Sequence, residues 1–596
     1  MNYYNNFINI NTSDDSSSYE YEYGILEKND DVFYVNDKEV ENNRALINDI
    51  VYVHENKVVQ IKERSKCIIS GILYLNSKMK YGIKNKKQIY LFKPNNKKYS
   101  TFYVCSSCNL NTQVYCIIEF KSWEINEKQP FGNIIEIFGK IGILENEYKN
   151  LLYFYDIFNK TQKYDPVKIK SHKKIIEEIC PSKKDYDIFC IDPKGSKDLD
   201  DGFHYNNSNN DDYIEVGIHI AYPYKFLNTD NDFKLIMKRV STIYLLNNIN
   251  LISSIYADNL SSFIEKNYRF SISLILKIKN NIVIDYHIEE KIVYIEKNYD
   301  YNEFDNIYKN NKNLVDFVDF SKDFFELSTI DSHILVEKWM IYANKTIATY
   351  LINMNLSNVI LRVHNGTTPN LIPTTLTPNL IPTPNLIPIS NVTKYDNKKI
   401  DNTVLKNENL IQFLKNKKEN SASYEIINKE NNQYHSKMNN EYYTHFTSPI
   451  RRCIDFFNQY LLIEKKDKYT NEELQHIINH INIYEKNLKK FYRKKSRIDF
   501  IFNKKDINEI ITEGYIVEFN NNYMRLFIPE YNLDEKIFLF HYKFNKIINI
   551  EKTENSIEYI YEDNEYKYTL YEKLIIKIHI LVYEENIFEK IKIEIL

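Results

Sequence analysis

The stretch "IDPKGSKDLDDGFHY", Ile191 to Tyr205, places four aspartates within ten residues: Asp192, Asp198, Asp200 and Asp201. The apolar run "DIFC" just before it is typical of a β-strand, Pro193 ends such a strand, and Gly195 permits a tight reversal. The acids are therefore expected in a turn at the end of a strand. An acidic run of this kind is usually a solvated turn. The alternative is a site that turns several carboxylates toward one point.

Carboxylates held close together repel one another and raise each other's pKa unless a cation neutralises them. Mg²⁺ and Mn²⁺ take oxygen ligands and leave coordination positions for water or phosphate. Two such ions about 4 Å apart can activate a water molecule and hold the leaving oxygen of a phosphodiester. The acidic stretch is thus a candidate site for phosphodiester hydrolysis.

A second candidate is "YTHFTSPIRRCIDFF", Tyr443 to Phe457. Pro449 suits a helix N-terminus, which predicts Thr447 or Ser448 as the cap and places Arg451 and Arg452 in the first turn. Arginine there opposes the helix dipole, and a phosphate held by amides and guanidinium groups would offset that penalty. The alternative is two surface arginines on an ordinary helix.

The overall composition points to several domains and gives no sign of a polyanion partner. The chain has 596 residues, and its 78 Lys and Arg against 81 Asp and Glu leave a net charge of -3. Basic residues that bind nucleic acid must therefore be clustered locally. The 7 cysteines are too few for a disulfide framework, and we interpret Cys105, Cys108 and Cys116 as structural thiols rather than zinc ligands. No apolar run is long enough for a membrane helix, so we expect no membrane association and a soluble monomer in the cytoplasm or the nucleus.

Shifts in pattern divide the chain. Residues 1–19 are rich in Asn, Ser and Asp, which predicts a disordered tail. Short alternating runs up to about residue 165, and again after 509, predict small antiparallel barrels. Between them, strand-like runs give way to helical periodicity, which predicts a mixed α+β domain. The repeat "TPNLIPTTLTPNLIPTPNLIP" inside that domain predicts a surface loop, because its prolines exclude helix and sheet.

These stretches resemble the RNB exoribonucleases, the family of RNase II, RNase R and the exosome catalytic subunit. The acidic stretch resembles the family's I-D-P-x-x-A-x-D-x-D-D-A signature, and "YTHFTSPIRR" is a near-verbatim match to another family block. Between them, "VGIHIAY", "RVSTIYLL", "NYRFSIS" and "LVEKWMIYAN" resemble further blocks in family order. "NRALINDIVYV" and "WEINEKQPFGNIIEIFGKIGILENE" look like the ends of the family's two cold-shock barrels.

The resemblance implies a multidomain α+β fold in which an RNB catalytic domain is flanked by small antiparallel β-barrels of the OB or cold-shock type. We expect the first barrel at 20–65, the second at 66–165, the catalytic domain at 180–503 with an expanded low-complexity loop at 366–432, and a C-terminal RNA-binding barrel at 509–596. We also expect no endonuclease domain before the barrels.

The resemblance also implies roles for single residues. Asp192, Asp198 and Asp201 would ligate metal, with Asp200 near the metals and most sensitive for cleavage. Arg451 would hold the scissile phosphate with Arg452 beside it. Tyr244 would stack on a base near the 3′ end, and Glu337 would lie near the terminal nucleotide. Without the resemblance, Tyr244 reads as a core tyrosine, Glu337 as a solvent-face acid and His219 as a structural histidine.

The expected function is hydrolysis of single-stranded RNA from its 3′ end to nucleoside 5′-monophosphates, with Mg²⁺ or Mn²⁺ as cofactor and RNA as partner. The alternatives are a catalytically silent RNA-binding scaffold with the same fold and a nuclease acting on single-stranded DNA. The chain departs from the family pattern at Tyr222, Leu246, Gln459 and Tyr460. None of these positions is one of the four acids or Arg451, so we expect activity to be retained.

Overall fold

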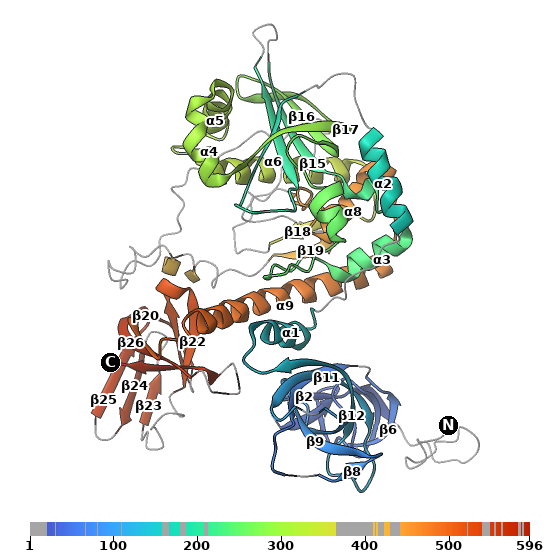
Figure 1. Cartoon of the computed structure of the whole chain (residues 1–596), viewed down its shortest axis with the longest axis vertical. Coiled ribbons are helices and arrows are strands. Elements are labelled where there is room, and N and C mark those ends of the chain that lie inside the picture. Colours follow the sequence, from blue (N-terminus) through green and yellow to red (C-terminus); the bar gives the residue numbers. More distant parts are fainter. Residues whose placement is uncertain are drawn as a thin grey trace, which may run out of the picture. The chain divides into compact units, whose positions relative to one another are not determined.

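The structure is a computed structural model of the whole chain (Figure 1). It describes residues 21–157, 166–178, 186–207, 213–364, 422–428, 442–538 and 549–596 with short gaps, and a few residues between 409 and 414. The predicted tail at 1–19 and most of the loop predicted at 366–432 lie outside the described residues. The chain forms two compact units, one made of residues 1–158 and 487–596 and the other of residues 159–486.

The first unit begins with two small three-stranded sheets around one apolar core. The buried residues of this core include Leu26, Val35, Val51 and Val58. Alternate residues of β5 are buried, as the period of two predicts for a sheet with one face on a core. The strands are β1 (Glu22–Ile25), β5 (Ile50–His54) and β6 (Lys57–Glu63) in one sheet, and β2 (Glu27–Asn29), β3 (Val32–Val35) and β4 (Lys38–Val40) in the other.

A second β-structure follows, in which five strands close into a ring because β10 pairs with both β12 and β9. Its core includes Leu73, Phe92, Phe102 and Val114, all fully buried. The elements are β7 (Ile68–Tyr74), β8 (Ile83–Lys84), β9 (Lys87–Pro94), β10 (Phe102–Ser106), β11 (Gln113–Ser122), β12 (Phe131–Lys140) and α1 (Leu144–Phe154).

The same unit also contains the C-terminal strands. One sheet has the order β22-β21-β20-β26-β27 and a second has the order β23-β24-β25. The strands are β20 (Glu509–Asn520), β21 (Tyr523–Ile528), β22 (Leu533–Phe538), β23 (Asn549–Lys552), β24 (Ser556–Tyr561), β25 (Asn564–Thr569), β26 (Lys573–Ile580) and β27 (Ile591–Ile595).

The second unit is built on a closed five-stranded barrel with helices packed against it (Figure 1). Phe189 and Phe203 of the barrel contact Phe317 of α5 (Lys312–Phe324), which stacks on Trp339 of α6 (Ser332–Asn353). The barrel strands are β13 (Ile188–Asp192), β14 (Asp201–Asn206), β15 (Ile214–Ala221), β16 (Tyr268–Lys279) and β17 (Ile282–Asp300). The predicted α+β class is thereby confirmed, whereas the domain bounds stay predictions.

The remaining elements of this unit are mostly helical. The hairpin of β18 (Ile360–Val363) and β19 (Ser423–Ile426) flanks the predicted loop. The helices are α2 (Pro166–Glu178), α3 (Asp230–Arg239), α4 (Tyr301–Ile307), α5 (Lys312–Phe324), α6 (Ser332–Asn353), α8 (Cys453–Glu464) and α9 (Asn471–Asn503), the last of which continues into the other unit's residues. None of the described helices is long and apolar enough to cross a membrane.

Candidate active site

The acidic stretch connects two neighbouring strands of the barrel. β13 ends at Asp192 and β14 begins at Asp201, as the position of Pro193 predicts. Gly195 has a φ of +82°, a conformation that favours glycine, and the Ser196 N–H donates to the Pro193 carbonyl in the turn. At the end of the connection, the Ala221 N–H of β15 donates to the Asp200 carbonyl at 2.7 Å. The barrel therefore fixes the backbone that carries the acids.

Two of the four acids are buried, and Asp192 and Asp198 are partly exposed. Asp200 is 1% exposed and Asp201 is 7% exposed. Burial raises the pKa of Asp192, and the charges of Asp201 and Asp200 raise it further. Burial also raises the pKa of Asp201, against the opposing effect of Arg451 and Arg452. The interpretation of this stretch as a solvated turn is therefore wrong for Asp200 and Asp201, whereas Pro193, Lys194, Gly195 and Lys197 in the connection are exposed.

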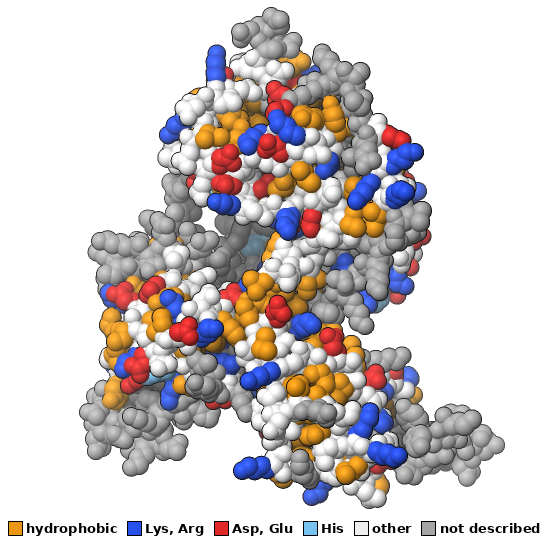
Figure 2. All heavy atoms as spheres, viewed as in Figure 1, with side chains coloured by type: hydrophobic (Ala, Val, Ile, Leu, Met, Phe, Trp, Pro, Cys, Tyr) orange, Lys and Arg blue, Asp and Glu red, His pale blue; other side chains and the backbone are white. Residues whose placement is uncertain are grey.

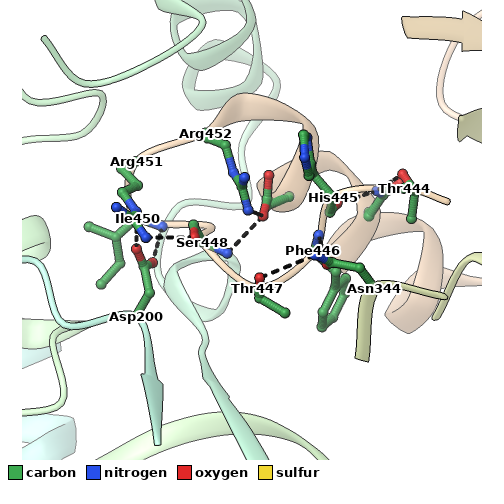
Figure 3. Close-up of polar contacts among 12 residues, drawn as sticks. Asp200, Asn344, Thr444, His445, Phe446, Thr447, Ser448, Ile450, Arg451 and Arg452 are labelled. Atoms are coloured by element: carbon green, nitrogen blue, oxygen red, sulfur yellow. Dashed lines mark hydrogen bonds and ion pairs between the residues drawn. The ribbon is translucent and has the colours of Figure 1, made fainter. Parts of the chain in front are cut away.

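Asp200 joins the acidic stretch to the arginine segment, 250 residues away (Figure 3). The Ile450 N–H donates to Asp200 Oδ1 at 2.9 Å, and Arg451 Nε lies 2.9 Å from Asp200 Oδ2. Burial raises the pKa of Asp200 well above its usual range, although Arg451 and the Ile450 N–H oppose the rise. Burial lowers the pKa of Arg451, but the negative charge of Asp200 raises it, and the net effect is a raised pKa. The two sequence candidates thus form one site.

The predicted helix start is wrong. Residues 449–451 form a turn, and α8 begins at Cys453 with Arg452 as its N-cap and no side-chain cap. The N–H groups of Arg451 and Arg452 donate to the Ser448 carbonyl, which closes this turn. Both arginines therefore precede the first helical turn.

The residue that completes this helix start is Asp455, which the sequence analysis did not single out. Its side chain is fully buried, and its Oδ1 accepts hydrogen bonds from the Ser448 N–H and from Arg452 Nη2, both at 2.7 Å. Burial opposes the charge of Arg452, and Asp455 more than offsets this, so that the pKa of Arg452 is raised. Asp455 therefore links Arg452 to the backbone of the turn that carries Arg451.

Polar side chains from other elements hold the rest of the segment (Figure 3). Asn344 of α6 accepts from the Phe446 N–H at 2.8 Å and donates to the Tyr443 hydroxyl at 3.0 Å. Asn458 of α8 donates to Thr444 Oγ1 at 2.9 Å and to the His445 carbonyl at 2.8 Å. The arginine segment is thus an irregular chain that side chains of α6 and α8 hold by hydrogen bonds.

Tyr244 lies beside the acids, which excludes its interpretation as a core residue. It is 38% exposed, and its hydroxyl donates to Asp198 Oδ2 at 2.6 Å. Glu337 is exposed on α6, and no hydrogen bond or ion pair in the described part of the chain joins it to the acids. The structure therefore brings Tyr244 to the site and does not connect Glu337 with it.

Tyr301, at the start of α4, also lies near the acids, and nothing in the sequence pattern pointed to it. Burial raises the pKa of Tyr301 to about 12, and the charges of Asp201 and Asp192 add to this effect. Its ring stacks on His333 of α6 with centroids 3.7 Å apart. The sequence does not distinguish Tyr301, because it is one of 51 tyrosines in the chain.

His219 is a structural histidine, as its place on a strand predicted. It is fully buried, its Nε2 lies 2.7 Å from His204 Nδ1, and its Nδ1 lies 2.7 Å from Ser273 Oγ. Both ring nitrogens therefore have partners within the barrel wall.

The residues of the acidic site fit a divalent cation by their chemistry. Asp192 Oδ2 is buried and has no hydrogen-bond partner among the described residues. A buried carboxylate oxygen of this kind requires a proton or a cation. However, no three His, Cys, Asp or Glu side chains in the described ranges are grouped closely enough to enclose a metal ion. Asp198 is held by Tyr244 and Asp200 by Arg451, which leaves Asp192 and Asp201 as the acids best placed to begin such a site.

Comparison with known proteins identifies two domains. Residues 183–330 and 315–468 match the RNB domain, and residues 89–156 match the Dis3-like cold-shock domain 2. Among curated proteins, the exosome complex exonuclease RRP44 of Mus musculus is 23% identical over 487 residues, which are 71% of this chain and 50% of that protein. Ribonuclease R of Chlamydia pneumoniae is 24% identical over 397 residues, 57% of this chain and 56% of that protein. The chain thus spans about half the length of these relatives.

Solved structures show the same fold. Mycoplasma genitalium RNase R in complex with ribose methylated single-stranded RNA has a TM-score of 0.69 at 16% identity and covers 96% of this chain and 100% of its own. Yeast Ssd1, described as a pseudonuclease, has a TM-score of 0.61 at 16% identity and covers 90% of this chain and 81% of its own.

Proposed function

We propose that this chain, which belongs to the RNB family, hydrolyses single-stranded RNA from its 3′ end and releases nucleoside 5′-monophosphates. The observation that carries the proposal is the meeting of the buried acids with Arg451 at Asp200. Metal-dependent hydrolysis of a phosphodiester uses oxygen ligands that hold the metal ions and a cationic group that stabilises the charge developing on the phosphate. This site offers both kinds of group within one unit of the chain.

In this proposal the four acids bind the metal ions and Arg451 binds the phosphate. Asp192, Asp198, Asp200 and Asp201 would hold Mg²⁺ or Mn²⁺, which supplies an activated water and neutralises the leaving oxygen when bound. Arg451 would leave Asp200 to contact the scissile phosphate, with its guanidinium fork matched to two phosphate oxygens. Arg452 keeps its bond to Asp455 and fixes the position of its neighbour.

The position of Tyr244 supports a role for its ring in binding the 3′ end of the RNA. Its ring is partly exposed beside Asp198, so a base near the cleaved bond would find an aromatic face there. Stacking on tyrosine does not distinguish bases, which suits degradation without sequence preference. Discrimination against DNA would rest on contacts to the 2′-hydroxyl.

The proposal is tested by digestion of a 5′-labelled single-stranded RNA with Mg²⁺ or Mn²⁺. Wild type is compared with Asp200→Asn and with Asp285→Asn, a change of the same type at an exposed acid of β17. We expect mononucleotides and a short residual 5′ fragment from wild type and Asp285→Asn, and no product from Asp200→Asn. An RNA blocked by a 3′-phosphate tests whether hydrolysis starts at a free 3′ end. An all-DNA strand tests whether the enzyme requires ribose.

The fold of yeast Ssd1 makes a silent scaffold the second candidate, since that structure is described as a pseudonuclease. RNA binding by wild type without cleavage under either metal would favour this candidate. Equal cleavage of RNA and DNA would instead favour a nuclease with no sugar preference.

A further inference from the structure

A chain of buried hydrogen bonds joins three strands of the barrel in the second unit, and the proposed mechanism does not use it. His204 Nδ1 of β14 lies 2.7 Å from His219 Nε2 of β15, and the two residues are 2% and 0% exposed. At one end of this pair, His204 Nε2 lies 3.2 Å from Glu215 Oε1. At the other end, His219 Nδ1 lies 2.7 Å from Ser273 Oγ of β16, which in turn lies 3.1 Å from Ser271 Oγ. The chain of bonds thus connects the neighbouring strands β14, β15 and β16.

The carboxylate at one end determines the direction of every bond in this chain. The hydrogen bond from His204 lowers the pKa of Glu215, so this group is ionised and can only accept. His204 therefore donates from Nε2, and its Nδ1 accepts from the Nε2–H of His219. The remaining nitrogen, His219 Nδ1, accepts from the Ser273 hydroxyl. Burial lowers the pKa of both histidines, which keeps the two rings neutral as this arrangement requires.

Packing holds the two rings in the same place as the hydrogen bonds do. Gly217 of β15 is paired with His204 of β14. A Cβ atom added at Gly217 would lie 2.1 Å from two atoms of the His204 ring and 2.9 Å from His219 Nε2. The Tyr186 ring stacks on His204 with centroids 3.7 Å apart. The absence of a side chain at Gly217 therefore provides the space that the histidine pair fills.

The two strands that carry the histidines also carry the acids of the candidate active site. Asp201 is the first residue of β14 and pairs with Ile220 of β15, the residue next to His219. One position further along β15, the Ala221 N–H donates to the Asp200 carbonyl. A shift of β14 against β15 would therefore move Asp200 and Asp201. Groups that bind a metal have to be held within about 0.5 Å of their working positions, so such a shift matters.

We infer that His204 and His219 are positioning residues, whose bond aligns β14 with β15 and thereby holds Asp200 and Asp201 where the metal ions bind. The inference rests on the proposed function, because it concerns the same acids. The histidines act through the strands, since no hydrogen bond joins either ring to these acids in the described part of the chain.

The test uses two substitutions that each keep one contact of His204. In His204→Asn the short amide takes the place of Nδ1, which keeps the bond to His219 and loses the bond to Glu215. In His204→Gln the longer side chain keeps the bond to Glu215 and loses the bond to His219. Titration of the full chain with Mn²⁺, followed by the electron paramagnetic resonance of the free ion, measures metal affinity without any cleavage. An Asp192→Asn, Asp201→Asn double variant gives the background from other acids.

We expect His204→Asn to bind Mn²⁺ like wild type and His204→Gln to bind it about tenfold more weakly, as is typical when a residue that supports metal ligands is changed. In single-turnover digestion of RNA, His204→Gln should lower kcat and leave KM unchanged, because the RNA does not contact the histidines. Ser273→Ala removes only the hydroxyl at the end of the chain of bonds and should weaken Mn²⁺ binding in the same direction. This milder variant keeps the test decisive if His204→Gln does not fold.

Ile278→Ala is the matched control for a loss of stability alone. Ile278 is 1% exposed and pairs with Ile214, at the opposite end of β15 from the acids. This variant should lower the melting temperature and leave Mn²⁺ affinity unchanged. Wild-type Mn²⁺ affinity in both His204→Gln and Ser273→Ala, or an equal loss of affinity in Ile278→Ala, would overturn the positioning role. If wild type binds Mn²⁺ and cleaves no RNA, the proposed function fails, and the order of Mn²⁺ affinities still decides this inference.

Discussion

Asp455 shows how a residue without a direct contact to the acids can determine the geometry of the site. Its fully buried carboxylate accepts hydrogen bonds from the Ser448 N–H in the turn and from the partly buried guanidinium of Arg452. Breaking a buried ion pair by removing one partner costs about 3–5 kcal/mol, because the other charge stays behind. The turn that presents Arg451 depends on this pair.

We therefore expect Asp455→Asn to lower both stability and the rate of hydrolysis. The fall in kcat should exceed the change in KM, because Arg451 is needed most when charge develops on the phosphate. Urea unfolding and single-turnover digestion measure the two effects. Glu535→Gln, which removes the partner of the buried Arg497 in the other unit, is the matched control and should lower stability alone. An unchanged rate in Asp455→Asn would contradict the role assigned to this residue.

The buried acids also make a prediction about pH. The pKa of Asp192 and of Asp201 is raised in the folded chain, so the folded state keeps protons that the unfolded chain releases above about pH 4. Stability from these groups is present at low pH and is lost as pH rises through the folded pKa. In EDTA, the melting temperature should fall from about pH 5 to about pH 8.

Asp192→Asn should flatten this dependence, and Asp285→Asn should not. Mg²⁺ or Mn²⁺ should raise the melting temperature more at the upper end of this range, since a cation replaces protons there. Equal stabilisation of wild type and an Asp192→Asn, Asp201→Asn double variant would exclude these acids as ligands. Scanning calorimetry or dye-based melting in metal-free and metal-containing buffers provides the measurement.

At the scale of elements, the sheet of β1, β5 and β6 presents aromatic rings to solvent. Tyr23 is 59% exposed and pairs across the strands with Tyr52, with ring centroids 6.1 Å apart. Lys62 Nζ lies 4.5 Å from the centre of the Tyr23 ring. Exposed aromatic rings next to a lysine are typical of surfaces that stack bases and contact the backbone.

A Tyr23→Ala, Tyr52→Ala variant should bind long single-stranded RNA more weakly, because each stacked base contributes about 1–3 kcal/mol. A Tyr23→Phe, Tyr52→Phe variant keeps both rings and should bind like wild type. Anisotropy titration distinguishes these outcomes. Equal weakening by both variants would mean that the hydroxyl groups, and not the rings, make the contact.

At the scale of the whole molecule, the numbers of positive and negative side chains are nearly equal, with 78 Lys and Arg and 81 Asp and Glu. Lys, Arg, Asp and Glu side chains are interspersed over the face drawn in Figure 2, in keeping with the net charge of -3. Binding of a polyanion would therefore rely on local features such as Arg451. Two of the family positions that differ in this chain are buried: Tyr222 is 3% exposed, and Gln459, which is fully buried, donates to the Ala221 carbonyl at 2.7 Å.

The long insertion between β18 and β19 is predicted to be dispensable for folding. Arg362 of β18 lies over the Tyr424 ring of β19 and pairs with Glu485 of α9 at 2.7 Å, so the hairpin is held by a contact within it and by a contact to α9. Loop entropy changes slowly with length, by about 0.6 kcal/mol for each doubling. Replacing residues 368–406 with a short Gly-Ser linker should therefore shift stability by about 1 kcal/mol or less and leave RNA hydrolysis intact. Loss of hydrolysis with an unchanged melting temperature would assign the insertion a functional role.

The sequence by itself determined the parts of the site that depend on local chemistry. Pro193 ends β13, Gly195 takes the positive φ of the turn, and the four acids follow within a few residues. The family blocks, read in order, predicted the RNB domain that the comparisons confirm. The helix start at 447–452 was the exception, since a buried Asp455 holds those residues in a turn.

Only the tertiary structure decided how these parts meet. The bonds from Ile450 and Arg451 to Asp200 join residues far apart in the chain, and no local pattern specifies such a pair. Burial, which raises the pKa of Asp192, Asp200 and Asp201, likewise comes from elements distant in sequence, as does the proximity of Tyr301. Local preference fixes where a strand or turn ends, whereas the protonation of a carboxylate depends on which atoms the fold brings around it.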